Sequence, residues 1–301
     1  MEQLERSGTP EASRAPLVSI VVLTLNSERY IDECLASIVG ADELVEIIVI
    51  DGGSTDTTID RVQRHSRPIR IIVAVGASIP QARNIGLATA KGQYILFLDS
   101  DDRLRWSSLE SVMGLLRRES PSFVVCNNAR IDENGNLIGM RTAEYPDRFE
   151  GLLRNPVSML GMVCRRDLLR SVGGFSEDFA VAEDYDLWLR LFEVAQGRKL
   201  EVSLAEHRIR PESASRIDRL RTRILGMRAS MGAAERRGIR LPSRAALAGY
   251  WYLRLIEEVV AGTGIRPTIW VAILGERIRP SAAGRRHELP DPIVPSEAEL
   301  D

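Results

Sequence analysis

The sequence is poor in cysteine and lacks the cysteine spacing of a disulfide framework or a zinc site. Its three cysteines, Cys34, Cys126 and Cys164, lie far apart, and none belongs to a CxxC pair. An odd and scattered set of this kind is typical of proteins from a reducing compartment. We therefore expect free thiols and a cytoplasmic location.

Long hydrophobic runs are missing as well. No apolar stretch approaches the roughly 18 residues that a membrane-spanning helix needs, and the acidic N-terminus lacks the apolar core of a signal peptide. Lysine is nearly absent: only Lys91 and Lys199 occur, so almost all of the 40 basic residues are arginines. Because the formal net charge is only −2, no overall field attracts nucleic acid, and we expect no nucleic-acid partner.

The chain of 301 residues is 44% hydrophobic and 27% charged, which is enough to bury a sizeable core. Its first part alternates short runs rich in Val and Ile with amphipathic segments, a β-α-β-α-β-α-β pattern that predicts an α/β fold with parallel strands and crossover helices. The expected strands are 17–25, 45–50, 69–73 and 94–98, and the expected helices are 28–39, 57–65 and 80–90. Asn26 and Ser27 are expected to cap the first helix.

After residue 102 the pattern is less regular. We expect helices at 106–118, 167–172 and 183–195, strands at 123–126 and 200–204, a hairpin at 131–141 and an irregular segment at 156–164. The predicted organisation is a disordered N-terminus (1–16), an α/β domain (17–215, with halves 17–102 and 103–215), a helical extension (216–280) and a disordered acidic tail (281–301).

The most informative stretch runs from Tyr94 to Asp102, where an apolar strand ends in Asp99-Ser100-Asp101-Asp102. The carboxyl end of a central strand is where open α/β sheets place their ligands. Side chains at i and i+2 share one face of an extended chain, so Asp99 and Asp101 can converge on one point. Two carboxylates suit a hard divalent cation such as Mg²⁺ or Mn²⁺. The alternative is a solvated turn that caps the next helix.

Three further stretches carry polar groups at element ends. The loop 51–56 (Asp-Gly-Gly-Ser-Thr-Asp) follows a buried strand and opens a helix, where glycines allow a close approach of an anion. Residues 82–86 (Ala-Arg-Asn-Ile-Gly) offer an arginine to a phosphate or a base carbonyl. Glu183-Asp184 opens a helix and offers a general base. Each stretch also has a purely structural reading, as a capped turn, a surface arginine or carboxylates that complement a helix dipole.

Read together with residues 18–26, these stretches resemble the family 2 glycosyltransferases, which are inverting enzymes of the GT-A fold. The resemblance covers residues 17 to about 215 and rests on five motifs in the family's order and spacing. It implies transfer of a sugar from a nucleotide-diphosphate sugar to a hydroxyl acceptor. The expected setting is the synthesis of cell-surface polysaccharide or glycoconjugate.

The resemblance also implies roles for individual residues. Asp51 corresponds to the aspartate at the base, Arg83 to an arginine near base and phosphates, Asp99-Ser100-Asp101 to the DxD motif, and Asp184 to the catalytic base, with Glu183 beside it. The candidate nucleotide-sugar-binding residues are Thr24, Asn26, Asp51, Gly53, Arg83, Asn84, Asp99, Ser100, Asp101 and Arg210, and the candidate metal ligands are Asp101 and Asp99.

Two departures from the family pattern bear on this assignment. Gly52 stands where many members have a second aspartate. The family often carries Arg-x-His after the base helix, with the histidine near the metal, whereas this chain has Arg208-Ile209-Arg210. An arginine cannot ligate a metal but can pair with a diphosphate. Arg210 therefore keeps open a non-catalytic nucleotide-sugar-binding or scaffold protein on the same fold. A nucleotidyltransferase, which also pairs a parallel sheet with acidic metal ligands, is a second alternative.

The expected partners are a UDP-, GDP- or dTDP-sugar donor and a hydroxyl acceptor, which a lipid could carry. Arginines and apolar residues alternate between 208 and 254 at helical spacing. Such helices can pack on the α/β domain, or they can place arginines at lipid headgroups as a peripheral membrane contact.

Overall fold

The computed structural model describes residues 15–40, 43–143, 145, 158–210, 219–238, 249 and 251. The expectations for residues 1–14, for the acidic tail and for most of the helical extension lie outside the described residues. The division of the chain into domains therefore stays a prediction.

The first half of the described chain forms four parallel strands joined by helices, as the alternating pattern predicts. The strands are β1 (Val18–Thr24), β2 (Val45–Asp51), β3 (Ile69–Val73) and β4 (Tyr94–Asp99), and the helices are α1 (Ile31–Ala36), α2 (Thr58–Gln63) and α3 (Ile79–Thr89). β1 pairs with β2 and β4, and β2 pairs with β3, all in parallel register. Because β1 and β4 are buried on both faces, their sequences are almost continuously apolar.

The second half contains more strand than the sequence predicts. Its elements are β5 (Arg103–Leu104), α4 (Trp106–Glu119), β6 (Phe123–Ile131), β7 (Leu137–Arg141), a 3₁₀ turn η1 (Met159–Gly161), β8 (Met162–Arg165), α6 (Arg166–Ser171), α7 (Glu183–Val194) and β9 (Arg198–Arg208). β6 and β9 are longer than expected. β8 was expected to be irregular, but it is a strand that pairs antiparallel with both β4 and β6.

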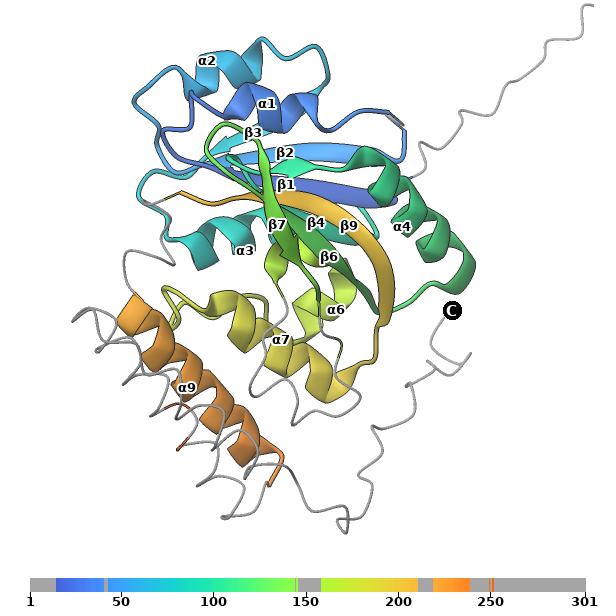
Figure 1. Ribbon diagram of the computed structural model, residues 1–301, viewed down its shortest axis with the longest axis vertical. Helices are drawn as coiled ribbons and strands as arrows, with labels where there is room; N and C mark the ends of the chain where they lie inside the picture. The colour runs from blue at the N-terminus through green and yellow to red at the C-terminus, as the bar shows by residue number, and fades with distance from the viewer. Residues whose placement is uncertain are drawn as a thin grey trace, which may run out of the picture.

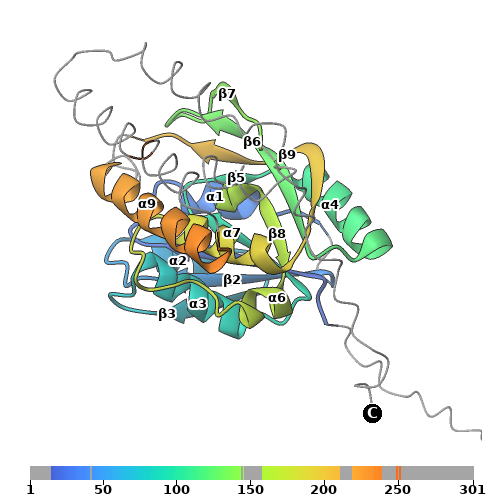
Figure 2. The ribbon, with the colours of Figure 1, turned by 90° about the horizontal axis from the view of Figure 1, so that it is seen from below.

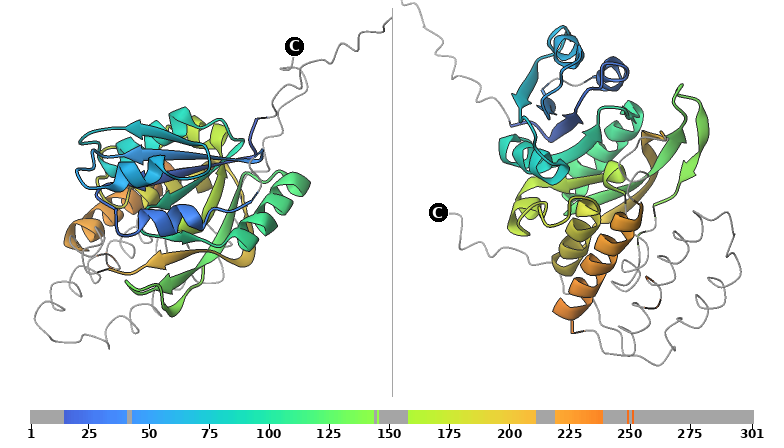
Figure 3. Two further views of the ribbon diagram at one scale, coloured as in Figure 1. Left: turned by 90° about the horizontal axis from the view of Figure 1, so that it is seen from above. Right: turned by 90° about the vertical axis from the view of Figure 1, so that its left-hand side faces the viewer.

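These strands form one mixed sheet in the order β3-β2-β1-β4-β8-β6-β9-β5, with β7 paired to β6. One apolar cluster lies between the sheet and α1, α2 and α4, and a second lies between the sheet and α3, α6 and α7. Figure 1 shows α1 and α2 above the sheet and α3 and α7 below it. The right-hand view in Figure 3 shows the same order, with the blue helices at the top and the yellow α7 below the strands. The fold is therefore α/β, with helices on both faces of a central sheet.

Helix α1 differs from its prediction because it begins only at Ile31, and its N-terminal neighbour Tyr30 makes no side-chain cap. Asn26 does not cap this helix: its side-chain oxygen accepts a hydrogen bond from the backbone nitrogen of Thr55, 2.9 Å away. Asn26 also has a positive φ of 48°, which asparagine tolerates better than most residues. The residues after β1 thus support the neighbouring β2–α2 loop instead of a helix.

Helix α9 (Arg219–Arg236) packs on α7, as Figure 2 shows. Ala229, Ala233 and Ala234 belong to the same apolar cluster as α7, and Arg236 forms an ion pair of 2.8 Å with Glu193 of α7. The packing alternative for this part of the extension is confirmed. Among the described residues, no helix has the length and apolar character that crossing a bilayer requires.

Candidate functional site

The carboxyl ends of three neighbouring strands bring the first candidate residues together. Thr24 of β1 is the Cα partner of Asp51 of β2, and Leu23 of β1 is the partner of Asp99 of β4. The three strand ends therefore lie side by side at one edge of the sheet, which is the ligand-binding edge of open α/β folds. The hydroxyl of Thr24 is buried there and has no hydrogen-bond partner among the described residues.

Asp51 holds the shape of the loop that follows β2. Its Oδ2 accepts hydrogen bonds of 2.9 Å from the backbone nitrogens of Gly53 and Ser54, and its Oδ1 accepts one from the Ser54 hydroxyl. Gly53 has a φ of 98°, and a Cβ there would lie 3.2 Å from Val75, so this position favours glycine. One lone pair of Oδ1 remains for a ligand.

Arg83 is the buried centre of an ionic network that joins α3 to α7. Its guanidinium donates a hydrogen bond to the carboxylate of Glu183 and lies 3.7 Å from the carboxylate of Asp99. The guanidinium also lies over the ring of Phe175, 5.5 Å from its centre. An arginine in such a setting is held in one orientation, and it links the DxD segment to the start of α7.

Glu183 is almost completely buried, and burial raises its pKa to about 7 although Arg83 opposes the shift. Asp184 is only half-buried, and it forms no ion pair with any residue that the structure describes. The preceding Ala182 has a φ of 64°, an uncommon conformation for alanine that the surrounding structure must enforce. Of the two acids, Glu183 is occupied by its hydrogen bond with Arg83, whereas the carboxylate of Asp184 can accept a proton.

Asp101 is paired with Arg210, at a distance of 2.6 Å between the carboxylate and the guanidinium. Arg210 lies over the ring of Tyr30, 5.4 Å from its centre, and its Nε is buried without a hydrogen-bond partner among the described residues. Burial raises the pKa of Asp101, and the neighbouring Asp99 adds to this shift while Arg210 opposes it. The guanidinium of Arg210 thus stabilises the negative charge of Asp101, the second carboxylate of the Asp99-Ser100-Asp101 stretch.

Asp102 and Arg208 were not among the predicted site residues, but they fix the acidic turn. The backbone nitrogen of Arg208 donates to Asp102 Oδ1 (2.7 Å), and its Nε donates to the carbonyl oxygen of Asp101 (2.8 Å). Arg208 is 1% exposed and also pairs with Glu33 of α1. One feature of the sequence indicates this role: Arg208-Ile209-Arg210 resembles the Arg-x-His pattern, with Arg208 at the position of its arginine.

Two other predicted residues make mainly structural contacts. The side-chain amide of Asn84 makes two hydrogen bonds of 2.8 Å with the backbone of Phe175, one as donor and one as acceptor. The hydroxyl of Ser100 lies 2.7 Å from that of Ser27. Both side chains lie beside the site, and their hydrogen bonds brace the segments that carry Arg83 and Asp99.

The oxygen ligands suitable for a divalent cation are the carboxylates of Asp99 and Asp101. Within the described ranges, no group of three or more acidic, histidine or cysteine side chains is placed to hold a metal ion. Two carboxylates still fit Mg²⁺ or Mn²⁺, because such ions commonly take one or two carboxylates and fill the remaining positions with water and substrate phosphate. Binding at Asp101 would require its ion pair with Arg210 to open.

The chain is similar to known proteins in sequence and in fold. Residues 19–170 match the model of glycosyl transferase family 2. The chain belongs to this family. It is 32% identical over 183 residues to the Escherichia coli UDP-Glc:alpha-D-GlcNAc-diphosphoundecaprenol beta-1,3-glucosyltransferase WfgD, which covers 59% of this chain and 70% of that enzyme.

An Escherichia coli chondroitin synthase is 31% identical over 201 residues, which are 63% of this chain but only 28% of the synthase. This family 2 member thus spans less than a third of that relative's length. Among solved structures, Staphylococcus aureus TarS 1–349 in complex with UDP-GlcNAc has a TM-score of 0.61 at 19% identity, covering 85% of this chain and 75% of TarS.

The mannosyltransferase PcManGT from Pyrobaculum calidifontis, in complex with GDP-Man and Mn²⁺, has a TM-score of 0.58 at 20% identity. The alignment covers 87% of this chain and 79% of that enzyme. These likenesses show that the chain has the fold of the GT-A glycosyltransferases.

Proposed function

We propose that this family 2 protein is an inverting glycosyltransferase that moves a sugar from a nucleotide-diphosphate sugar to a hydroxyl acceptor. The observation that carries the proposal is the ionic network from Asp99 through Arg83 to Glu183, which joins the DxD segment to the start of α7 beside the unpaired carboxylate of Asp184. This network supports the proposal because it connects the segment that we assign to the leaving group with the helix that carries the proposed proton acceptor.

The donor would lie across the carboxyl ends of β1, β2 and β4. The free lone pair of Asp51 and the unpartnered hydroxyl of Thr24 are the groups that we assign to the nucleoside. Buried polar groups without partners are uncommon in proteins, so an unpaired hydroxyl at a ligand-binding edge supports this assignment. Asn26 and Gly53 shape the same edge, and Arg83 and Arg210 supply positive charge toward the diphosphate.

In the proposed reaction, the oxygen of the acceptor hydroxyl attacks the anomeric carbon while Asp184 accepts the hydroxyl proton. The bond between the anomeric carbon and the diphosphate oxygen breaks, and the nucleoside diphosphate leaves. A single displacement of this kind inverts the configuration at the anomeric carbon. Glu183 acts as a positioning residue, because its pairing with Arg83 fixes the first turn of α7.

We propose Mg²⁺ or Mn²⁺ as the cofactor, held by Asp101 with Asp99 nearby. When bound, the cation supplies positive charge to the departing diphosphate. The structural neighbour PcManGT, whose structure contains GDP-Man and Mn²⁺, supports this choice. Arg210 pairs with Asp101, so a cation held by Asp101 would leave the guanidinium of Arg210 available to pair with the diphosphate.

The acceptor and the location of the protein form the remaining part of the proposal. Relatives named as chondroitin synthase and as a glucosyltransferase for a diphosphoundecaprenol-linked sugar support a role in polysaccharide or glycoconjugate synthesis. A lipid-linked acceptor would be consistent with a cytoplasmic protein that contacts the membrane peripherally through residues 216–280. In the described part of this extension, Arg228 and Ile224 are exposed, whereas Ala229, Ala233 and Ala234 of α9 belong to the apolar cluster that contains α7.

Calorimetric titration with UDP-, GDP- and dTDP-sugars, with and without Mn²⁺, tests the proposal. We expect one donor to bind and to be hydrolysed slowly when no acceptor is present. Binding without any turnover would instead identify a non-catalytic nucleotide-sugar-binding protein. If the protein binds none of the three donors, the proposed donor site is wrong.

A further inference from the structure

The aromatic ring of Tyr30 is surrounded by guanidinium groups. Tyr30 directly precedes α1 and is 7% exposed. Three guanidinium carbons lie over its ring, at 4.7 Å from the ring centre for Arg208, 5.0 Å for Arg29 and 5.4 Å for Arg210. All three distances are within the roughly 6 Å at which the π electrons of an aromatic ring attract a cation. The ring therefore attracts positive charge beside the acidic turn.

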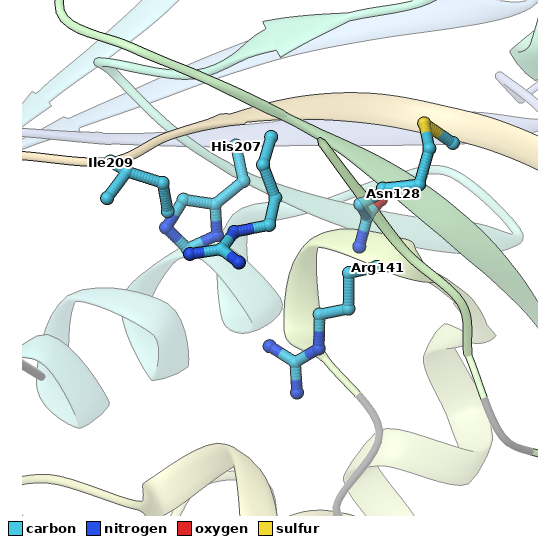
Figure 4. A pocket seen from close by; sticks show the side chains of 6 residues that line it. Asn128, Arg141, His207 and Ile209 are labelled. Carbon is cyan, nitrogen blue, oxygen red and sulfur yellow. The ribbon is translucent and has the colours of Figure 1, made fainter. Parts of the chain in front are cut away.

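The alternation of side chains along β9 explains why two of these arginines reach the ring. His207 and Ile209 line a cavity of about 310 Å³ together with residues of β6 and β7, as Figure 4 shows. The chain stays extended past the end of β9, because the backbone nitrogen of Ile209 donates a hydrogen bond of 2.9 Å to the last carbonyl oxygen of β6. Successive side chains of an extended chain point to opposite faces. Arg208 and Arg210 therefore point away from this cavity, to the face of the sheet that carries α1.

The two arginines differ in how firmly the rest of the structure holds them. Arg208 is 1% exposed, and its guanidinium donates to the carboxylate of Glu33 and to three backbone carbonyl oxygens. Arg210 is 31% exposed, its guanidinium lies 2.6 Å from the carboxylate of Asp101, and its Nε has no hydrogen-bond partner among the described residues. Within the described part of the chain, the polar and ring contacts of Arg210 are thus this ion pair and the ring of Tyr30.

The ring matters most when the carboxylate of Asp101 is engaged by something else. A divalent cation held by Asp101 would open the ion pair with Arg210. The ring of Tyr30 is then the described contact that keeps the guanidinium of Arg210 beside the acidic turn. A guanidinium in this place can bind phosphate oxygens through paired, charge-assisted hydrogen bonds.

We propose that Tyr30 is a positioning residue for Arg210. Its ring holds the guanidinium where it pairs with Asp101 in the free protein and with the diphosphate of the donor once Asp101 binds a cation. The inference rests on the proposed function, and it adds a residue that acts on the donor through another side chain. Without the ring, the donor itself would have to order the long side chain of Arg210, and the lost conformational freedom weakens binding.

The test is a double-mutant cycle on nucleotide binding. Calorimetry in saturating Mn²⁺ measures the affinity of the full chain for UDP, GDP and dTDP, and the nucleotide that binds best is used with Tyr30→Leu, Arg210→Met and the double variant. Tyr30→Leu should weaken binding about fivefold in the wild-type background. In the Arg210→Met background it should change the affinity by less than about twofold, because the guanidinium that the ring positions is absent.

Tyr30→Phe is the matched control. It keeps the ring and removes only the hydroxyl, which makes no hydrogen bond within the described residues, so the affinity should stay within about twofold of the wild type. Melting curves show whether Tyr30→Leu folds; if it does not, Tyr30→Met fills the same space with a flexible side chain that has no aromatic face. An equal loss of affinity in both backgrounds, or a loss in Tyr30→Phe as large as in Tyr30→Leu, would overturn the proposal.

A titration with Mn²⁺ in the absence of nucleotide separates this inference from the proposed function. Because the ring also holds Arg210 on Asp101, Tyr30→Leu should raise the affinity for Mn²⁺ about two- to fivefold, and this gain should vanish in the Arg210→Met background. If the wild type binds no nucleoside diphosphate, the proposed function fails, and the Mn²⁺ cycle alone decides whether the ring holds Arg210. An unchanged Mn²⁺ affinity in Tyr30→Leu would show that it does not.

Discussion

Replacing Arg210 by methionine should increase the affinity of the DxD site for a divalent cation. In the wild type a cation can bind Asp101 only after the 2.6 Å ion pair with Arg210 opens. The side chains of Arg210 and Asp101 are 31% and 16% exposed, so the pair lies between the surface and buried cases. Surface ion pairs contribute about 0–1 kcal/mol to stability, and breaking a buried ion pair costs about 3–5 kcal/mol. We therefore expect that opening the pair between Arg210 and Asp101 costs about 1–3 kcal/mol. This range corresponds to roughly a 5- to 150-fold gain in affinity.

The measurement is a titration of the nucleotide-free protein with Mn²⁺, followed by calorimetry or by the electron paramagnetic resonance signal of free Mn²⁺. It is run at pH 8, because burial and Asp99 raise the pKa of Asp101 and Arg210 no longer opposes them in the variant. Arg198→Met removes the same charge from the far end of β9 and should leave Mn²⁺ affinity unchanged. An Arg210→Met variant with wild-type Mn²⁺ affinity would refute the exchange between guanidinium and cation.

Two further predictions concern the start of α7. Asp184→Asn should reduce sugar transfer by about 100-fold or more, because a general base usually contributes a factor of this size. The affinity for the nucleoside diphosphate, measured by calorimetry, should stay within about twofold of the wild type. Near-normal turnover in the variant would show that Asp184 is not the general base. For Glu183, burial raises the folded-state pKa from 4.5 to about 7, so its stabilising contribution is complete below about pH 4.5 and is lost as the pH rises through 7. The melting temperature should therefore fall more steeply between pH 5 and pH 8 in the wild type than in Glu183→Gln, and equal slopes would contradict the raised pKa.

The first half of the fold could be predicted because its central strands β1, β2 and β4 are buried on both faces. A strand such as β1 then appears as an uninterrupted apolar run, and the polar residues that end it mark the edge of the sheet. The family resemblance rests on the polar residues at these strand ends, and the match to the family model confirms it. Helix α1 was predicted too long because Asn26 bonds to Thr55 of the next loop, a contact that nothing near Asn26 in the sequence indicates.

The second half was harder because its pairing is non-local. Strand β8 has only four residues, and it is a strand because it fits between β4 and β6; neither partner is adjacent in the chain. The ion pair of Arg83 with Glu183 joins residues 100 positions apart, and the one between Asp101 and Arg210 spans a similar distance. Local patterns placed these residues on the right elements, but only the tertiary structure shows which carboxylate each arginine contacts.

The configuration of the released sugar tests the central claim most directly. The donor that binds best is incubated with the protein and a divalent cation in the absence of acceptor, and proton nuclear magnetic resonance follows the anomeric signal of the first sugar released by hydrolysis. Single displacement assisted by Asp184 predicts a sugar with the anomeric configuration opposite to that of the donor, before mutarotation. Release with the donor's own configuration, or no release under any of these conditions, would contradict the account.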